Sequence, residues 1–193
     1  MKRVLFICTG NTCRSPMAEA MLRHSARERG LAVEVRSAGT STIHGMPVSD
    51  KSIQALKSRL IEHEGTSSPV QAELVKWADY IFTMTEGHKQ SLMLMYPESS
   101  GKVYTLKEFA WLTPNNEQLL RQLDSLIAEL QTLHQLGQPL DEEIRKAAME
   151  LEQVIPSFDI VDPFGGSQAQ YDACAAEIEQ AIHQILDKWA TLS

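Results

Sequence analysis

The chain has 193 residues, of which 43% are hydrophobic and 22% are charged, a composition typical of one globular domain rather than of a disordered chain. Its formal net charge of −7 argues against broad, non-specific binding of nucleic acid. Three cysteines are too few for a disulfide framework, and no apolar run approaches the roughly 18–20 residues that a membrane span needs. We therefore expect a cytoplasmic, soluble protein that binds neither nucleic acid nor membranes.

Short apolar segments alternate with amphipathic segments along the first part of the chain. The apolar segments predict β-strands at Val4–Cys8, Val33–Val35, Tyr80–Met84 and Val103–Leu106. Helices are predicted to begin at Ser15-Pro16, Ser49 and Ser68-Pro69, because serine suits a helix N-cap and proline suits the first turn. A long amphipathic helix at Tyr171–Leu192 is expected to dock on the sheet. This alternation indicates an α/β fold with a parallel sheet covered by helices on both faces.

Residues 113–156 have a different pattern, which we interpret as a helical hairpin inserted into a single domain that spans residues 1–193. Two apolar stripes at helical spacing flank Gly137-Gln138-Pro139, and Asp141 can cap the second helix. The segment carries eight acidic residues and three basic ones. We expect the stripes to pack on each other or on the rest of the domain, and a bound partner protein at the hairpin is the alternative.

The most informative segment runs from Cys8 to Pro16, between a predicted buried strand and a predicted helix. Five residues separate Cys8 from Arg14. A loop of this length can turn its backbone N–H groups inward around an anion, and the dipole of the following helix adds positive potential there. Gly10 and Asn11 tolerate the unusual backbone angles that such a loop needs. The guanidinium of Arg14 can then hold two oxygens of a tetrahedral oxyanion.

Cys8 lies at the base of this loop and is predicted to be a nucleophile. The positive field favours its thiolate, and the Ser15 hydroxyl can donate a hydrogen bond to it. A thiolate below a phosphate-sized ring of N–H groups is suited to attack phosphorus and form a phosphocysteine intermediate. The alternative is a buried, inert Cys8 in a plain strand-to-helix turn.

Cys13 lies on the same loop as Cys8. A metal site is not favoured, because Cys174 has no ligand partner at the usual spacing, and we expect neither a metal nor another cofactor. Under oxidation, Cys13 could form a disulfide with Cys8 and protect it from irreversible oxidation. The alternative is a small side chain that the loop tolerates.

Phosphoryl transfer also needs a group that protonates the leaving atom and later activates water. We predict Asp162 for this role, because Pro163 stiffens its loop and Gly165-Gly166 allows a sharp turn. Phe164 could form a wall at the mouth of the site. The alternatives are that Asp162-Pro163 only begins a turn, or that the nearby Asp159 supplies the proton.

Four separated segments of the chain resemble the low-molecular-weight protein-tyrosine phosphatases, and they occur in the same order. These segments are Val4–Ala20, Arg36–Thr40, Lys102–Glu108 and the loop around Asp162. The resemblance implies a four-stranded parallel sheet with helices on both faces and a phosphate-binding loop at the end of the first strand.

The resemblance also implies roles for individual residues. Cys8 would be the nucleophile, Arg14 would clamp the phosphate, and Asp162 would act first as general acid and then as base. The residues that would contact phosphate or substrate are Thr9, Gly10, Asn11, Thr12, Cys13, Ser15 and Phe164. Ser37 would help Asn11 to hold the loop in shape.

The chain departs from the family pattern in two places. Family members usually have a histidine near Gly65 that supports the asparagine of the loop. This chain has Thr66-Ser67-Ser68-Pro69 after Gly65, and His63 is only a weak substitute. The segment 113–156 is extra length that the family usually lacks, and it precedes the Asp162 loop directly.

Two positions resemble the protein-arginine phosphatase branch of the family, namely Thr12 and Phe164. A hydroxyl at position 12 could hydrogen-bond to a polar phosphoguanidinium, whereas an apolar side chain would pack against a phenyl ring. We therefore predict removal of phosphate from phosphoarginine in proteins, with phosphorylated proteins as partners and phosphotyrosine as the alternative substrate. An arsenate reductase would need two further suitably placed cysteines. A non-catalytic phosphate-binding module would not need Cys8, Arg14 and Asp162 together.

Overall fold

The computed structural model describes residues 1–191, and the chain divides into two units. The first unit comprises residues 1–110 and 158–191. Its elements are β1 (Lys2–Cys8), α1 (Arg14–Glu28), β2 (Val33–Gly39), α2 (Asp50–Lys57), α3 (Ala72–Trp77), β3 (Tyr80–Thr83), α4 (Glu86–Met95), the 3-10 helix η1 (Pro97–Lys102), β4 (Val103–Thr105), α5 (Leu106–Trp111, ending at the boundary) and α8 (Gln168–Thr191). The second unit, residues 111–157, holds α6 (Pro114–Gln135) and α7 (Glu142–Val154).

The four strands form one parallel sheet in the order β2-β1-β3-β4, which confirms the predicted fold class. Cys8 is paired with Gly39 of β2, and Val4 is paired with Val35 of β2 and with Tyr80 of β3. Because all strands run in the same direction, their carboxyl ends meet at one edge of the sheet, where α/β proteins usually bind ligands. The loop that follows Cys8 therefore lies at the edge where a binding site is expected.

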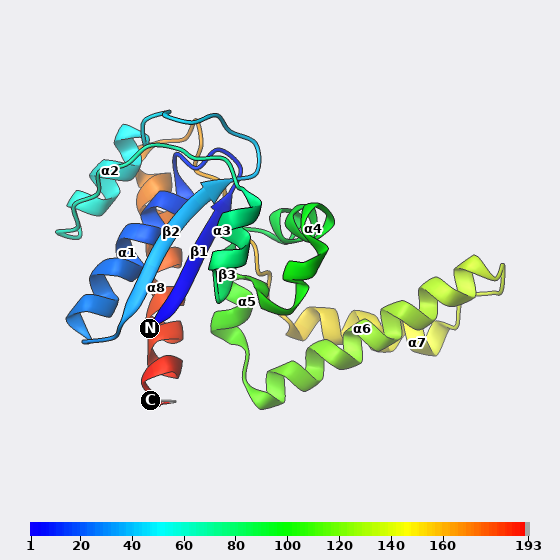
Figure 1. The fold of residues 1–193 in the computed structure, drawn as a ribbon. Helices are drawn as coiled ribbons and strands as arrows, with labels where there is room; N and C mark the ends of the chain where they lie inside the picture. Colours follow the sequence, from blue (N-terminus) through cyan, green and yellow to red (C-terminus); the bar gives the residue numbers. More distant parts are fainter. Residues whose placement is uncertain (192–193) are drawn as a thin grey trace. The chain divides into compact units, whose positions relative to one another are not determined.

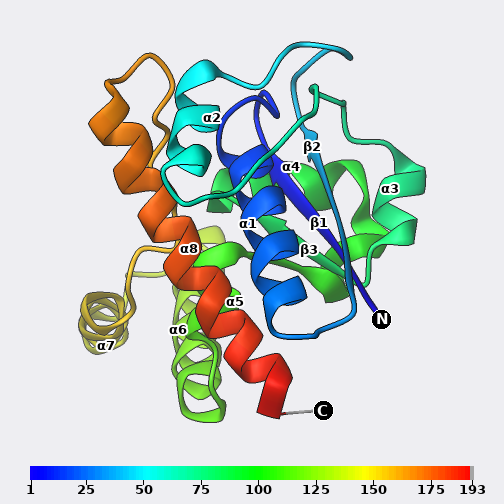
Figure 2. The same cartoon turned by 90° about the vertical axis from the view of Figure 1, so that its left-hand side faces the viewer.

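Helices cover both faces of the sheet, as predicted, and the side chains of β1 alternate between two apolar cores. Phe6 packs into the core formed with α1, α2, α5 and α8, which also contains Trp189. Leu5 and Ile7 pack into the core on the opposite face, with Val75 of α3 and Leu92 of α4. Figures 1 and 2 show α1 and α8 side by side on one face and α3 on the other. β1 is thus fixed on both sides, which makes it a rigid base for the loop after it.

Two of the predicted helix starts are wrong, and one is confirmed. α1 begins at Arg14, so that Ser15 lies inside the first turn, where its hydroxyl contacts Cys8 instead of capping the helix. α3 begins only at Ala72, because the chain at Ser68 is extended and hydrogen-bonded to Gly39. Ser49 does cap α2, since its side chain accepts a hydrogen bond from the backbone of the third residue of that helix.

The second unit contains the two helices that the sequence predicted for residues 113–156. α6 and α7 pack against each other, and Thr113 and Asp141 cap them through their side chains. The apolar stripe of α6 is partly buried along its whole length, at Leu119, Leu120, Leu123, Leu126, Ile127, Leu130 and Leu133. The stripe of α7 is buried at Ala148 but ends at Val154, which is 64% exposed.

The last helix, α8, begins at Gln168, three residues before the predicted start. Its buried face includes Ile178, Ile182 and Trp189, which pack into the core beside α1. The predicted end at Leu192 lies outside the described residues. Among residues 1–191, no helix is both long enough and apolar enough to cross a lipid bilayer.

Candidate active site

The loop between β1 and α1 carries the residues predicted for phosphate binding. Cys8 is the last residue of β1, and Arg14 is the first residue of α1. Asn11 has a φ of 52°, the left-handed conformation that a sharp turn of the loop requires. The chain after β2 fixes the loop from outside, because the backbone N–H groups of Thr40 and Ser41 donate to the carbonyls of its first two residues at 2.9 and 3.0 Å.

Gly39 allows this close approach of β2 to the loop. A Cβ atom at position 39 would lie 2.6 Å from the carbonyl oxygen of Thr9, 2.8 Å from the Thr42 side chain and 3.2 Å from the Asn11 side chain. The first of these distances is far below van der Waals contact, and backbone cannot move aside easily. Glycine at position 39 is therefore a requirement of the loop's position.

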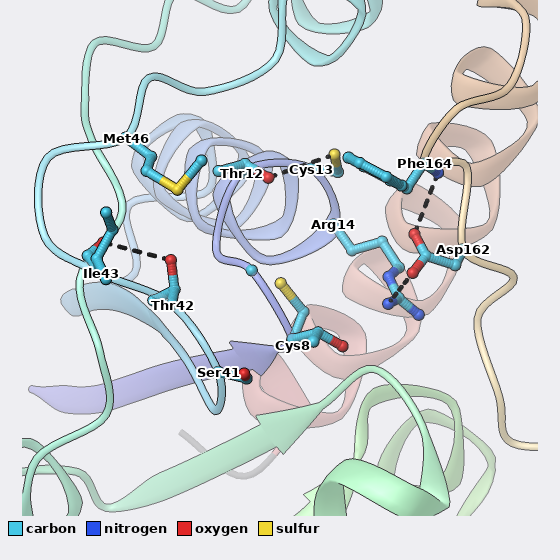
Figure 3. Close-up of a pocket in the computed structure, with 12 residues that line it drawn as sticks. Cys8, Thr12, Cys13, Arg14, Ser41, Thr42, Ile43, Met46, Asp162 and Phe164 are labelled. Carbon is cyan, nitrogen blue, oxygen red and sulfur yellow. Dashed lines mark hydrogen bonds and ion pairs between the residues drawn. The ribbon is translucent and has the colours of Figure 1, made fainter.

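The sulfur of Cys8 lies below the loop, and the residue is 3% exposed (Figure 3). The backbone N–H of Asn11 donates to it at 3.2 Å, and the Ser15 hydroxyl lies 3.0 Å from it. Both groups can donate to a thiolate, and the N-terminus of α1 adds its positive dipole. The sulfur is thus held between the backbone of the loop and the start of α1.

The side chain of Asn11 is buried at 1% exposure and ties the loop to three segments. Its amide nitrogen donates to Ser15 and to Ser37, both at 2.9 Å, and its amide oxygen accepts from the backbone N–H of Ser68 at 2.8 Å. Ser37 in turn donates to Glu19 at 2.5 Å. This network orients the hydroxyl that faces the Cys8 sulfur.

The backbone of Ser68, and not a histidine, completes the hydrogen bonds of Asn11. His63 makes none of the described contacts with Asn11; its Nδ1 is buried without a hydrogen bond, and burial lowers its pKa. Glu19 opposes part of that shift. Sequence reasoning missed Ser68, because a backbone N–H leaves no signal in the type of residue.

Arg14 and Asp162 are brought together from distant parts of the chain. Arg14 is 4% exposed, and its guanidinium donates to the Ile160 carbonyl at 3.1 Å and to the Asp162 carboxylate at 2.7 Å. The other carboxylate oxygen accepts from the backbone N–H of Phe164 at 3.2 Å. A backbone hydrogen bond from Ile160 to Met84, just after β3, anchors this loop to the sheet.

Asp159, the alternative acid, has a different environment. Its carboxylate accepts a 2.8 Å hydrogen bond from the backbone of Glu86, the first residue of α4. Its carbonyl accepts from Lys107 at 3.1 Å. The Asp159 carboxylate therefore binds the backbone at the start of α4, whereas the Asp162 carboxylate binds Arg14.

Cys8, Arg14 and Asp162 line one cavity of about 540 Å³. Its lining consists of Cys8, Thr9, Gly10, Thr12, Cys13, Arg14, Ser41, Thr42, Ile43, Met46, Asp162 and Phe164. Figure 3 shows Ile43 and Met46 on one side of the mouth and Phe164 on the other, with Thr12 between them. Ile43 is 69% exposed and Phe164 is 79% exposed. The cavity thus combines a polar base with an apolar rim.

Sequence reasoning missed one part of the lining, which consists of Ser41, Thr42, Ile43 and Met46. They follow β2 directly and so lie at the carboxyl edge of the sheet. A strand end followed by two exposed apolar side chains is the signal that could have indicated them.

The three cysteines are all free thiols, and Cys13 is buried in the wall of the cavity. Its sulfur lies 3.4 Å from the Tyr171 hydroxyl and 3.7 Å from the Ser49 hydroxyl. Burial raises the pKa of Tyr171 to about 12, and the hydrogen bond with Cys13 acts in the same direction. Among residues 1–191, no cluster of three His, Cys, Asp or Glu side chains has an arrangement that could hold a metal ion.

His88 also reaches the loop, which sequence reasoning missed. Its Nε2 lies 2.8 Å from the Thr9 hydroxyl, and its Nδ1 lies 2.8 Å from the Thr85 hydroxyl. Burial lowers the pKa of His88 to about 4, and the nearby charge of Arg14 contributes to the decrease. His88 is therefore a neutral imidazole at neutral pH.

A comparison with models of protein families identifies the family of this chain. The family model described as low molecular weight phosphotyrosine protein phosphatase matches residues 3–154. The chain belongs to this family. The matched range includes the loop from Cys8 to Arg14.

Curated relatives within the low molecular weight phosphatases include protein-arginine phosphatases. The one from Geobacillus stearothermophilus is 32% identical over 98% of this chain and 97% of that protein. The one from Bacillus subtilis is 35% identical over 78% of this chain and 97% of that protein. The present chain is therefore a phosphatase of the low molecular weight family.

Solved structures give the same result. The YwlE arginine phosphatase from Geobacillus stearothermophilus superposes with a TM-score of 0.71, at 32% identity, over 99% of this chain and 94% of that chain. A mutant YwlE arginine phosphatase with a phosphorylated active-site serine superposes with a TM-score of 0.72, at 30% identity, over 96% of this chain and 94% of that chain. The fold of this phosphatase is thus the fold of the family.

Proposed function

We propose that this phosphatase removes phosphate from phosphoarginine in proteins, with Cys8 as the nucleophile. The observation that carries the proposal is the buried Cys8 sulfur, 3.0 Å from Ser15 and 3.2 Å from the Asn11 N–H, in the same cavity as the Arg14–Asp162 pair. The protein-arginine phosphatases among its relatives support the choice of substrate.

In the first step, the phosphoryl group is held by the N–H groups of the loop and by Arg14. The Cys8 thiolate attacks phosphorus, an S–P bond forms and the P–N bond to the guanidine breaks. The electron pair of that bond stays on nitrogen, which takes a proton from Asp162. Since the Asp162 carboxyl is hydrogen-bonded to Arg14 at 2.7 Å, it lies next to any phosphoryl group that Arg14 holds.

In the second step, the phosphocysteine is hydrolysed. The Asp162 carboxylate accepts a proton from water as the water oxygen attacks phosphorus. The S–P bond breaks, and the thiolate of Cys8 leaves with its charge stabilised by the Ser15 hydroxyl and the Asn11 N–H. These two donors thus assist the step in which sulfur regains its negative charge.

The wall of the cavity supports phosphoarginine over phosphotyrosine. Thr12 lines the cavity with a hydroxyl that can hydrogen-bond to a guanidinium nitrogen. Ile43, Met46 and Phe164 at the rim can pack against the methylene groups of an arginine side chain. In the structure the Thr12 hydroxyl lies 3.7 Å from the Cys13 sulfur, a weak partner that a guanidinium nitrogen can replace and an aromatic ring cannot.

The test compares turnover of phosphoarginine-containing and phosphotyrosine-containing forms of one protein, with the parent, Thr12→Ile and Thr12→Ser. We expect the parent and Thr12→Ser to prefer phosphoarginine, and Thr12→Ile to shift toward phosphotyrosine by about tenfold or more in the ratio of kcat/KM values. Preference of the parent for phosphotyrosine would overturn the substrate assignment and leave the cysteine mechanism in place.

A further inference from the structure

His88 lies between two threonine hydroxyls that belong to different segments of the chain. Its Nδ1 is 2.8 Å from the hydroxyl of Thr85, just before α4, and its Nε2 is 2.8 Å from the hydroxyl of Thr9, in the loop after β1. His88 as a whole is 9% exposed. It therefore connects the start of α4 to the loop that surrounds the Cys8 sulfur.

The role of Thr85 as a helix cap sets the direction of these hydrogen bonds. The Thr85 oxygen already accepts the backbone N–H of His88 at 3.2 Å. The hydroxyl proton of Thr85 can then be donated to Nδ1, so that this hydroxyl accepts one hydrogen bond and donates another. In the opposite tautomer, two N–H groups would converge on the Thr85 oxygen, and its proton would have to turn away from the imidazole. The cap thus favours the tautomer that carries its proton on Nε2.

A proton on Nε2 makes Thr9 an acceptor toward His88. The hydroxyl proton of Thr9 must then point to another group, and Thr9 lines the cavity together with Cys8 and Arg14. We propose that His88 is a positioning residue, which turns the Thr9 hydroxyl into a hydrogen-bond donor to the bound phosphoryl group. This inference rests on the proposed function, because it needs an anion in the loop.

The charges around His88 agree with a neutral imidazole. Burial and the charge of Arg14 lower its pKa, whereas Asp159 and Asp162 act in the opposite direction, and the result is a pKa of about 4. An imidazolium would donate from both nitrogens and would force the Thr85 hydroxyl to turn. His88 therefore stays neutral and donates to Thr9 through Nε2 across the neutral pH range.

Two substitutions at position 88 separate the two nitrogens. The amide of His88→Gln can place an N–H near the position of Nε2, whereas the shorter amide of His88→Asn reaches only the position of Nδ1. Binding of inorganic phosphate to the full chain, measured by titration calorimetry, gives a readout that does not depend on turnover. Thermal unfolding of each variant checks that it is folded.

We expect His88→Asn and Thr9→Val each to weaken phosphate binding by about tenfold, the order of one hydrogen bond to a charged group. His88→Gln and Thr9→Ser should bind within about threefold of the parent, since each keeps its donor. The double variant of His88→Asn and Thr9→Val should bind no more weakly than Thr9→Val alone, because His88 acts through Thr9.

Nitrogen NMR shifts of the His88 ring in the parent protein give an independent test, which remains decisive if His88→Asn does not fold. A proton on Nδ1 would overturn the proposal. A double variant whose loss of phosphate affinity equals the product of the losses in His88→Asn and Thr9→Val would also overturn it. Phosphate binding that follows the expected pattern in a parent without phosphoarginine turnover would support the role of His88 and contradict the proposed function alone.

Discussion

Arg14 donates a 2.7 Å hydrogen bond to Asp162, although 148 residues separate them in the chain. One side chain is 5% exposed and the other 49% exposed, so the pair joins a buried cation to a carboxylate at the surface of the cavity. The same guanidinium holds the Ile160 carbonyl, two residues before the acid. The group predicted to clamp phosphate thus also positions the group predicted to supply the proton.

Asp162→Asn should slow turnover by a factor of about 10² to 10⁴ and leave phosphate binding within a few-fold of the parent. The amide removes the proton donor, whose contribution is of this size, but keeps an oxygen for Arg14. Single-turnover rates and phosphate titration measure the two effects. Asp159→Asn is the matched control, since the Asp159 carboxylate accepts a hydrogen bond from the Glu86 N–H at the start of α4. A parent-like rate in Asp162→Asn together with a large loss in Asp159→Asn would reverse the assignment of the acid.

Ser15→Ala should slow hydrolysis of the phosphocysteine by about tenfold or more. The variant lacks the hydroxyl that lies 3.0 Å from the Cys8 sulfur, and a hydrogen bond to a charged group contributes about 1.5–3 kcal/mol. Rapid-quench kinetics can separate formation of the intermediate from its breakdown. Ser25→Ala removes another buried hydroxyl from α1 and should leave both steps unchanged. Equal effects of the two substitutions would mean that Ser15 only stabilises the helix.

Gly39→Ala should weaken phosphate binding and lower the free energy of unfolding by about 1–3 kcal/mol, the usual cost of overpacking. The new methyl group would lie 2.6 Å from the Thr9 carbonyl and would push the loop outward. Gly101→Ala is a suitable control, because a Cβ atom there meets nothing within 4 Å. Chemical denaturation and phosphate titration provide the measurements. Parent-like values for Gly39→Ala would show that the loop is not tightly held.

Oxidation by hydrogen peroxide should inactivate the parent reversibly and Cys13→Ser irreversibly, if a disulfide between Cys8 and Cys13 protects the nucleophile. Tyr171→Phe should speed disulfide formation, because it removes the hydroxyl whose 3.4 Å hydrogen bond holds the Cys13 sulfur beside α8. Activity before and after treatment with a thiol reductant, with mass spectrometry of the loop peptide, measures both effects. Recovery of Cys13→Ser to the level of the parent would assign Cys13 to packing alone.

The features that were predictable from the sequence are those with a local cause. The apolar run before Cys8 makes a strand buried on both faces, and the spacing of Cys8 and Arg14 fixes a loop between that strand and a helix. The Ser15-Pro16 pair shows the limit of such local rules. The same two residues suit a helix cap, but Ser15 lies inside the helix and turns toward the sulfur.

Other features could not be predicted because only the topology brings their parts together. His88 reaches Thr9 because the ends of β1 and β3 are neighbours in the sheet. Ile43 and Met46 reach the cavity because β2 lies on the other side of β1. Strand order is a property of the whole chain, so no window around these residues contains the information.

The hydrogen bond from the Ser68 backbone to Asn11 has a consequence for how such chains are recognised. An amide hydrogen is present in every residue except proline, so many residue types at position 68 can make this hydrogen bond and hold the loop around the Cys8 sulfur. Loss of the histidine from this part of a family member is therefore no sign of a decayed enzyme, and a search that demands it would discard working members.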